Sequence, residues 1–212
     1  MNTDFINLLT HGSIKLTGGG TVYCDPYNIR EELHDADLVL ITHDHFDHFS
    51  PEDIAKILKT DTIFLVPSSM EDMVRKQLGK KAMVLSGEAG ESFDFEYADV
   101  KMVPAYNVGK KFHPKDNGWV GYLIDIGDMT IYIAGDTDIN DDIIDIKCDV
   151  AMVPVGGTYT MTAKEAAEFV NQIGCTIAIP THYGSVTGDE DCSKQFADAV
   201  DSSIEVRIIK QY

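Results

Sequence analysis

The sequence is short of basic side chains and of long apolar runs. Its 212 residues include 17 Lys and Arg against 35 Asp and Glu, which gives a net charge of -18. A field of that sign repels phosphate backbones and anionic lipid, so a nucleic-acid partner and a membrane surface are both disfavoured. The basic residues group only at 79–81 and at Lys110, Lys111 and Lys115, which are expected to be solvated turns. No apolar run approaches the ~20 residues needed to cross a bilayer. A small molecule is the partner class that remains.

Cysteine is also scarce, and its pattern bears on the compartment. The four residues form no C-x-x-C pair and are widely spaced, at Cys24, Cys148, Cys175 and Cys192. This spacing favours buried, reduced thiols over a disulfide framework. Residues 1–10 carry no basic region ahead of their short apolar stretch, so they make a poor signal peptide. Together these features predict a cytoplasmic protein.

Strand and helix patterns alternate along the chain without an internal repeat or a Pro- or Gly-rich linker. Two short apolar segments around the glycines at 18–20 predict a β-hairpin. Ser50 followed by Pro51 predicts the start of one helix, and a capping box from Thr162 to Glu165 predicts the start of another. Further helices are predicted near 70–78 and 191–200, and further strands at 38–41, 62–67, 82–85, 91–97, 100–106, 120–126, 129–136, 149–157, 176–184 and 204–209. We therefore predict a single α/β domain over residues 1–212, built from two sheets.

Polar side chains crowd the ends of three apolar segments. The stretch "THDHFDH" at 42–48 follows "LVLI", Asp136 follows "IYIAG", and His182 follows "IAIPT". Active sites of α/β proteins commonly form beyond strand ends, where distant segments converge. A lone histidine there is more often a hydrogen-bonded core residue, but so many carboxylates and imidazoles are electrostatically poor unless a cation neutralises them. Mixed His and Asp ligands suit zinc, and also iron or manganese, so we predict one or two divalent ions.

The cluster at 43–48, His-Asp-His-Phe-Asp-His, resembles the H-x-H-x-D-H motif of the metallo-β-lactamase superfamily of metal-dependent hydrolases. Asp136 in "AGDTD" is similar to the bridging aspartate of that family, and His182 in "PTHYG" to its last histidine. The resemblance implies a four-layer αββα sandwich of two mixed β-sheets flanked by helices. The segments "LTHGSIKL", "CDPY" and "IAGDTD" further resemble the branch that contains ascorbate-6-phosphate lactonase.

The same resemblance implies a ligand set for two metals. By position, His43 and His45 would hold the first metal. The second would be held by Asp47, His48 and His182, with Asp136 between the two ions.

One position departs from the family pattern. The family usually supplies a third histidine to the first metal, and the matching segment "VPAYN" places Asn107 there. An amide oxygen is a weaker donor to zinc than imidazole, so we expect one tightly held ion and a second bound only in excess. His113 could complete the site, and a surface histidine is the open alternative. His11 is expected to contact a ligand or the substrate, and Asp25 to orient a ligand histidine.

The metal site predicts a hydrolase that uses a metal-activated water. Asp47 and His113 are the candidate catalytic residues, with Asp47 accepting the proton for the leaving group. No G-x-S-x-G elbow or paired Cys and His points to covalent catalysis. The predicted substrate is a small anionic ester, lactone or phosphorylated metabolite, attracted in part by the lysines at 110, 111 and 115. The alternatives are a nuclease or phosphodiesterase of the same superfamily, which the net charge disfavours, and a metal-binding sensor without catalysis.

Overall fold

The structure, a computed structural model, describes residues 1–79 and 82–212. The basic turn predicted at 79–81 therefore falls mostly outside the described residues. The chain divides into two compact units, one formed by Met1–Gly87 with Lys210–Tyr212 and the other by Glu88–Ile209. The prediction of a single domain concerns the two units together, and it stays a prediction.

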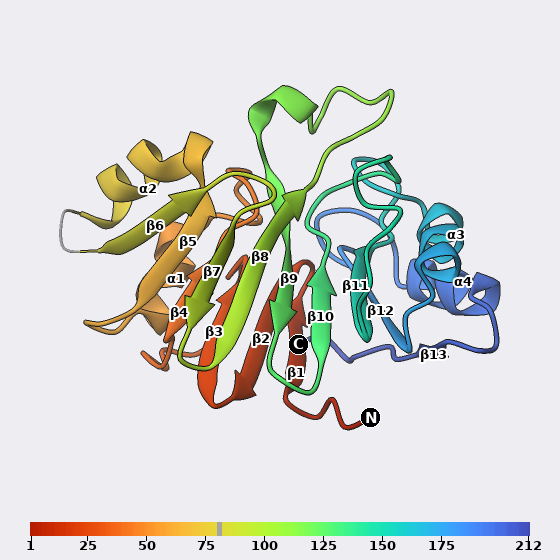
Figure 1. Ribbon diagram of the computed structural model, residues 1–212, viewed down its shortest axis with the longest axis horizontal. Helices are drawn as coiled ribbons and strands as arrows, with labels where there is room; N and C mark the ends of the chain where they lie inside the picture. The colour runs from red at the N-terminus through yellow and green to blue at the C-terminus, as the bar shows by residue number, and fades with distance from the viewer. Residues whose placement is uncertain (80–81) are drawn as a thin grey trace. The chain divides into compact units, whose positions relative to one another are not determined.

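The first unit is built on a six-stranded mixed sheet in the order β1-β2-β3-β4-β5-β6 (Figure 1). The first three strands pair antiparallel, and β3 to β6 pair parallel. The fully buried run in β4 suits a parallel strand that is covered on both faces. The strands are β1 (Ile6–Thr10), β2 (Ser13–Gly18), β3 (Gly20–Cys24), β4 (Leu38–Leu40), β5 (Ile63–Pro67) and β6 (Met83–Gly87).

Two helices pack on one face of this sheet. Helix α1 (Pro51–Ile57) begins as predicted, because the Ser50 side chain accepts a hydrogen bond from the Asp53 N–H and Pro51 occupies the first turn. Helix α2 (Glu71–Leu78) follows a short 3-10 turn, η1 (Ser68–Met70). Their inner residues share one core with alternate strand residues, among them Ile54, Ile57, Val74, Val39, Phe64 and Val66. The start of α1 fixes the end of the loop that carries the histidine motif.

The second unit is built on a seven-stranded mixed sheet in the order β13-β12-β11-β10-β9-β8-β7. Strands β7 to β10 pair antiparallel, and β10 to β13 pair parallel. The last strand is much shorter than the predicted 204–209. The strands are β7 (Ser92–Phe95), β8 (Ala98–Pro104), β9 (Val120–Asp125), β10 (Thr130–Ile133), β11 (Val150–Pro154), β12 (Ile177–Thr181) and β13 (Glu205–Val206).

Helices α3 (Ala163–Ile173) and α4 (Asp191–Ala199) pack on the parallel half of this sheet, beside β11 and β12 (Figure 1). The predicted capping box is present, since Thr162 and Glu165 exchange side-chain and backbone hydrogen bonds. Such a cap contributes about 1 kcal/mol. A short 3-10 turn, η2 (Lys115–Asn117), lies in the long loop between β8 and β9. The prediction of two mixed sheets flanked by helices is confirmed.

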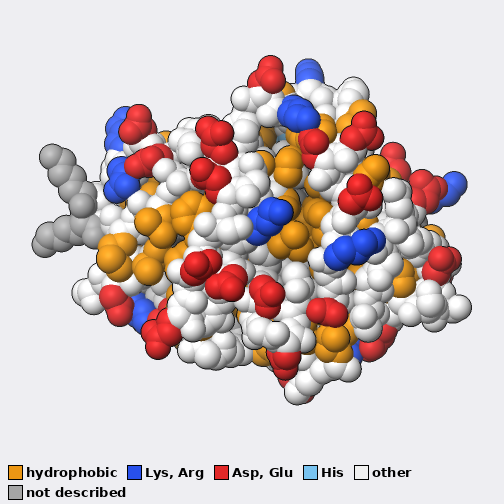
Figure 2. Space-filling model, in the orientation of Figure 1, with side chains coloured by type: hydrophobic (Ala, Val, Ile, Leu, Met, Phe, Trp, Pro, Cys, Tyr) orange, Lys and Arg blue, Asp and Glu red, His pale blue; other side chains and the backbone are white. Residues whose placement is uncertain are grey.

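The surface carries the charge imbalance of the sequence. On the face shown in Figure 2, Asp and Glu side chains outnumber Lys and Arg and lie scattered among them. No helix within the described residues is long and apolar enough to cross a membrane.

Candidate metal centre

The first cluster lies beyond the end of β4 and consists of five residues of the first unit: Asp25, His43, His45, Asp47 and His48. Thr42 and His43 are already buried, so the loop starts inside the unit. The backbone N–H groups of His48 and Phe49 both donate to the carbonyl of His45, at 3.0 and 2.8 Å, which closes a tight turn. Asp47 and His48 are buried inside this turn, while Asp44 and Phe46 are exposed.

Asp25 organises the first cluster from the strand alongside, just after β3. Its carboxylate accepts hydrogen bonds from the Thr42 N–H at 2.8 Å and the Thr42 hydroxyl at 2.6 Å. It also lies 2.7 Å from Nδ1 of His48, and the pair is almost fully buried. A carboxylate accepts only, so a neutral His48 carries its proton on Nδ1 and its lone pair on Nε2. The role predicted for Asp25, the orientation of a ligand histidine, stays a prediction.

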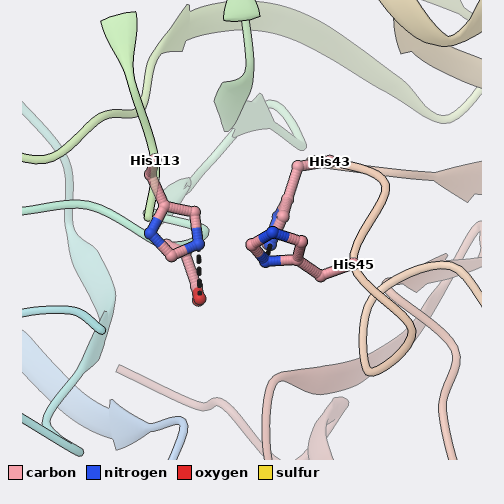
Figure 3. A group of neighbouring side chains, drawn as sticks. His43, His45 and His113 are labelled. Atoms are coloured by element: carbon pink, nitrogen blue, oxygen red, sulfur yellow. Dashed lines mark hydrogen bonds and ion pairs between the residues drawn. The ribbon is translucent and has the colours of Figure 1, made fainter. Parts of the chain in front are cut away.

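Thr42 performs a similar task for His43, a role that the sequence did not predict. Its single hydroxyl proton goes to Asp25, so Oγ1 accepts from Nδ1 of His43, 2.9 Å away. The Nε2 atom of His43 is then an acceptor, and Nδ1 of His45 lies 3.1 Å from it. Figure 3 shows the two rings meeting edge to face through these nitrogens. The two nitrogens thus converge on one position, as ligands of one cation do.

Asp47 connects the first cluster to His11. Its Oδ2 atom lies 3.2 Å from Nε2 of His11 and 3.6 Å from Nε2 of His48. His11 is fully buried in the turn between β1 and β2. Its φ of 53° and that of Asp25, 49°, are left-handed conformations that are uncommon outside glycine. His11 therefore contacts Asp47, a candidate ligand, and its role at the site stays a prediction.

The second cluster belongs to the second unit and consists of Asn107, His113, Asp136 and His182. Asp136 follows β10 and His182 follows β12, which are the two strands that flank β11 in the same sheet. The Oδ2 atom of Asp136 lies 3.1 Å from Nε2 of His113, and its Oδ1 atom lies 3.1 Å from Nε2 of His182. All three side chains are buried. One carboxylate thus serves two imidazoles, one through each oxygen.

Asn107 orients His113 in the long loop between β8 and β9. Its Oδ1 atom accepts from the backbone N–H of His113 at 3.1 Å and lies 3.1 Å from Nδ1 of the same residue. Its amide group donates to the carbonyl of Tyr159 at 2.9 Å. His113 is 1% exposed, so it is not the surface histidine of the alternative reading. Figure 3 shows its ring with the dashed contact to the carboxylate oxygen.

The tautomer of His113 tests whether the second cluster fits a metal. With its Nδ1 proton directed at Asn107, the Nε2 lone pair faces an Asp136 oxygen at 3.1 Å. Two lone pairs at that distance repel unless a proton or a cation lies between them. Buried imidazole nitrogens and carboxylate oxygens are ligands that zinc, iron and manganese accept. The residues present therefore fit a divalent metal.

The loop at 154–160 packs against the His182 segment. A Cβ atom on Gly156 would lie 2.4 Å from the His182 carbonyl oxygen and 2.8 Å from Cγ2 of Thr187. His182 itself has a φ of 57°, so its backbone is also in the left-handed region. Gly156 is therefore required for this close approach.

Two of the three lysines predicted to attract substrate are engaged by acidic partners. Lys110 donates to Asp138 at 2.6 Å and to the Thr160 carbonyl at 2.7 Å. Lys115 pairs with Asp142 at 2.5 Å, which lowers the pKa of that carboxyl group. Lys111 is exposed. Lys110 and Lys115 thus form ion pairs within the second unit. The acidic partners largely neutralise the attraction of these two lysines for an anion.

The fold and the two clusters define a metal-binding α/β protein, and comparisons with known proteins name its family. Residues 6–182 match the model of the beta-lactamase superfamily domain. A UPF0173 metal-dependent hydrolase of Lysinibacillus sphaericus is 30% identical, over 94% of this chain and 93% of that protein. A crystal structure of a candidate metal-dependent hydrolase from Parabacteroides distasonis is 32% identical, with a TM-score of 0.79 over 98% of this chain and 93% of that one.

The chain belongs to the metallo-β-lactamase superfamily and is a metal-dependent hydrolase of that superfamily. The fold is also found in a more distant protein, Igni18, a metallo hydrolase of Ignicoccus hospitalis that is 21% identical. The two structures have a TM-score of 0.75 over 97% of this chain and 94% of that one. The predicted superfamily is confirmed. The finer resemblance to ascorbate-6-phosphate lactonase stays a prediction.

Proposed function

We propose that the chain hydrolyses a small ester, lactone or phosphorylated metabolite with a metal-activated water. The observation that carries this proposal is the oxygen partner that faces Nδ1 of each of three buried histidines. His43, His48 and His113 each direct Nδ1 at an oxygen of Thr42, Asp25 or Asn107. In this tautomer each Nε2 carries a lone pair, which is the form of histidine that binds a metal ion, and orientation of ligands by such partners is typical of metal sites.

The ligand set of the proposal follows the family motif. His43, His45 and His113 hold one ion, Asp47, His48 and His182 hold the second, and Asp136 serves both. His113 takes the place of the missing third histidine, and Asn107 orients it rather than binding the metal. This replaces the expectation of one tight site with an expectation of two. Zinc is the proposed metal because of the mixed His and Asp ligands, with manganese or iron as alternatives.

The chain's own residues divide the work of hydrolysis. A bound divalent ion supplies a water whose pKa falls towards ~7. Asp47, held by His11, is placed to accept a proton and pass it to the leaving group. Burial, and to a smaller extent the Asp47 carboxylate, raises the pKa of the nearby Tyr27, so the Tyr27 hydroxyl stays neutral. No residue of either cluster is a nucleophile of the Ser or Cys type, so direct attack by water is the proposed step.

Three finer points belong to the same proposal. An anionic substrate would depend mainly on the metals, because Lys110 and Lys115 are engaged elsewhere. A nuclease remains the second candidate within the superfamily, and the net charge of -18 disfavours it. The cytoplasm remains the proposed compartment, since the four cysteines are free thiols.

The test combines a substrate panel with one substitution. The metal-loaded protein is assayed on generic esters, lactones and phosphodiesters, with and without chelator. Asp136→Ala should lower kcat/KM by about 10³-fold or more. The substitution removes the carboxylate that both ions would share, and these ions would stabilise the charge that develops in the transition state. Asp141→Ala, an exposed acidic control, should keep its activity. Near wild-type hydrolysis by the Asp136 variant would contradict the mechanism, and metal binding without any turnover would favour the sensor.

A further inference from the structure

The last described residues of the chain return to the first unit and contact the turn that carries His11. The Tyr212 N–H donates to the carbonyl of Leu9 at 3.1 Å. The Arg30 guanidinium lies 4.7 Å from the centroid of the Tyr212 ring. Between these anchors, Oε1 of Gln211 accepts a hydrogen bond of 2.6 Å from the backbone N–H of His11. A residue 200 positions away thus fixes the backbone of His11.

The turn at His11 needs such a contact. His11 has a φ of 53°, and the pairing of β1 with β2 shifts register between Leu8 and Thr10. A left-handed conformation is sterically unfavourable in an L-residue, so neighbouring contacts must maintain it. A hydrogen bond to the N–H of that residue fixes the direction of the peptide and therefore of the side chain.

The direction of the His11 side chain matters because its ring contacts Asp47. Its Nε2 atom lies 3.2 Å from Oδ2 of Asp47, and both side chains are buried. A rotation of the turn would move the ring off that oxygen. Asp47 would then be able to adopt another rotamer, in which its carboxylate points in a different direction.

We propose that Gln211 is a positioning residue for the metal centre, acting through His11 on Asp47. The proposal rests on the proposed function, in which Asp47 binds a metal ion. Partners of this kind contribute about 10–100-fold to metal affinity in other sites. The amide oxygen is the group that acts, and the Tyr212 ring anchors the segment against Arg30.

The experiment uses Co²⁺ as a spectroscopic probe of the full chain. Three variants are compared with the wild type: Gln211→Ala removes the acceptor, Gln211→Glu keeps an acceptor oxygen, and Lys210→Ala changes an exposed neighbour. Co²⁺ affinity is measured by competition with a chelator, and the visible absorption bands report ligand geometry. In the metal-free protein, hydrogen exchange of the His11 amide measures the hydrogen bond directly.

The alanine variant should bind Co²⁺ about 10-fold or more weakly, with altered bands, and its His11 amide should exchange faster. Gln211→Glu should restore both, and Lys210→Ala should match the wild type. Wild-type Co²⁺ affinity and bands in Gln211→Ala would overturn the proposal, and so would equal losses in the alanine and glutamate variants. If even the wild type bound no Co²⁺, the proposed function would fail, and an unchanged His11 exchange rate in Gln211→Ala would separately overturn the hydrogen bond.

Discussion

At the scale of single residues, the proposed function depends on where protons lie on buried imidazoles. Asp25 fixes the tautomer of His48, Thr42 that of His43, and Asn107 that of His113. Each partner is small and buried, and each is hydrogen-bonded to another segment, Asp25 and Thr42 to each other and Asn107 to the Tyr159 carbonyl. Substituting the partner should therefore alter metal binding while leaving the ligand itself in place.

Asn107 and His113 provide a prediction about metal stoichiometry. After dialysis, the wild-type chain should hold two metal ions, and His113→Ala should retain one. Asn107→Ala should retain the ligand His113 but weaken binding of the ion that it holds with His43 and His45 by about 10–100-fold, because the imidazole loses the acceptor for Nδ1. Metal analysis and calorimetry measure both effects. One tightly held ion in the wild type would show that His113 does not replace the missing histidine.

Tyr132 gives a prediction about stability. Its ring is fully buried beside Phe169, and its hydroxyl has no hydrogen-bond partner among the described residues. An unsatisfied buried hydroxyl costs about 1–3 kcal/mol, so Tyr132→Phe should leave the free energy of unfolding unchanged or raise it. Tyr23→Phe is the matched contrast, because the Tyr23 hydroxyl donates to Asp35 at 2.9 Å and its loss should cost about 1 kcal/mol. Urea denaturation compares the two, and a clear loss of stability in Tyr132→Phe would mean that the hydroxyl has a partner, such as a water molecule.

At the scale of elements, the strand ends were predictable and the long loops were not. Apolar runs followed by His or Asp predicted β4, β10 and β12 with their ligands, because burial and strand pattern are local signals. The pairing of Asn107 with His113 depends on the path of an irregular loop, which has no periodic signal. Gln211 contacts His11 only through the tertiary fold, so its sequence position gives no indication of a role.

The free thiols were predicted from the spacing of the cysteines along the sequence. Burial raises the pKa of Cys175 to about 11 and that of Cys148 to about 12.

The loop after β11 gives the prediction at this scale. Gly156→Ala should displace the segment after β12, because the added Cβ would meet the His182 carbonyl at 2.4 Å. We expect weaker metal binding and a loss of stability of about 1–3 kcal/mol, typical of overpacking. Gly18→Ala, where the added Cβ meets nothing within 4 Å, is the control. Calorimetric metal titration and thermal unfolding measure the two effects, and unaltered metal affinity in Gly156→Ala would show that the His182 backbone tolerates the shift.

At the scale of the whole molecule, metal binding should control stability as well as activity. Both clusters collect buried acidic and imidazole groups in a chain of net charge -18, so a bound cation relieves repulsion in the folded state. A ligand that binds only the folded chain, at 100 times its Kd, stabilises it by about 2.7 kcal/mol.

The corresponding prediction is a melting temperature that rises with added Zn²⁺ and falls with chelator. Activity should disappear and return in the same concentration range. Asp136→Ala should show a much smaller shift, because it lacks the shared ligand. A melting temperature independent of metal and chelator would contradict tight binding to the folded chain.

The left-handed backbone at His11, Asp25 and His182 has a consequence for protein engineering. Glycine adopts this conformation without the steric cost that an L-residue incurs, so a glycine at His11 or His182 would relieve the backbone of the metal-free chain while removing an imidazole. Asp25 differs, because its carboxylate also accepts two hydrogen bonds from Thr42 that glycine would lose. A screen that scores melting temperature without metal would thus remove the chemistry of this protein first, whereas a screen with metal present would retain it.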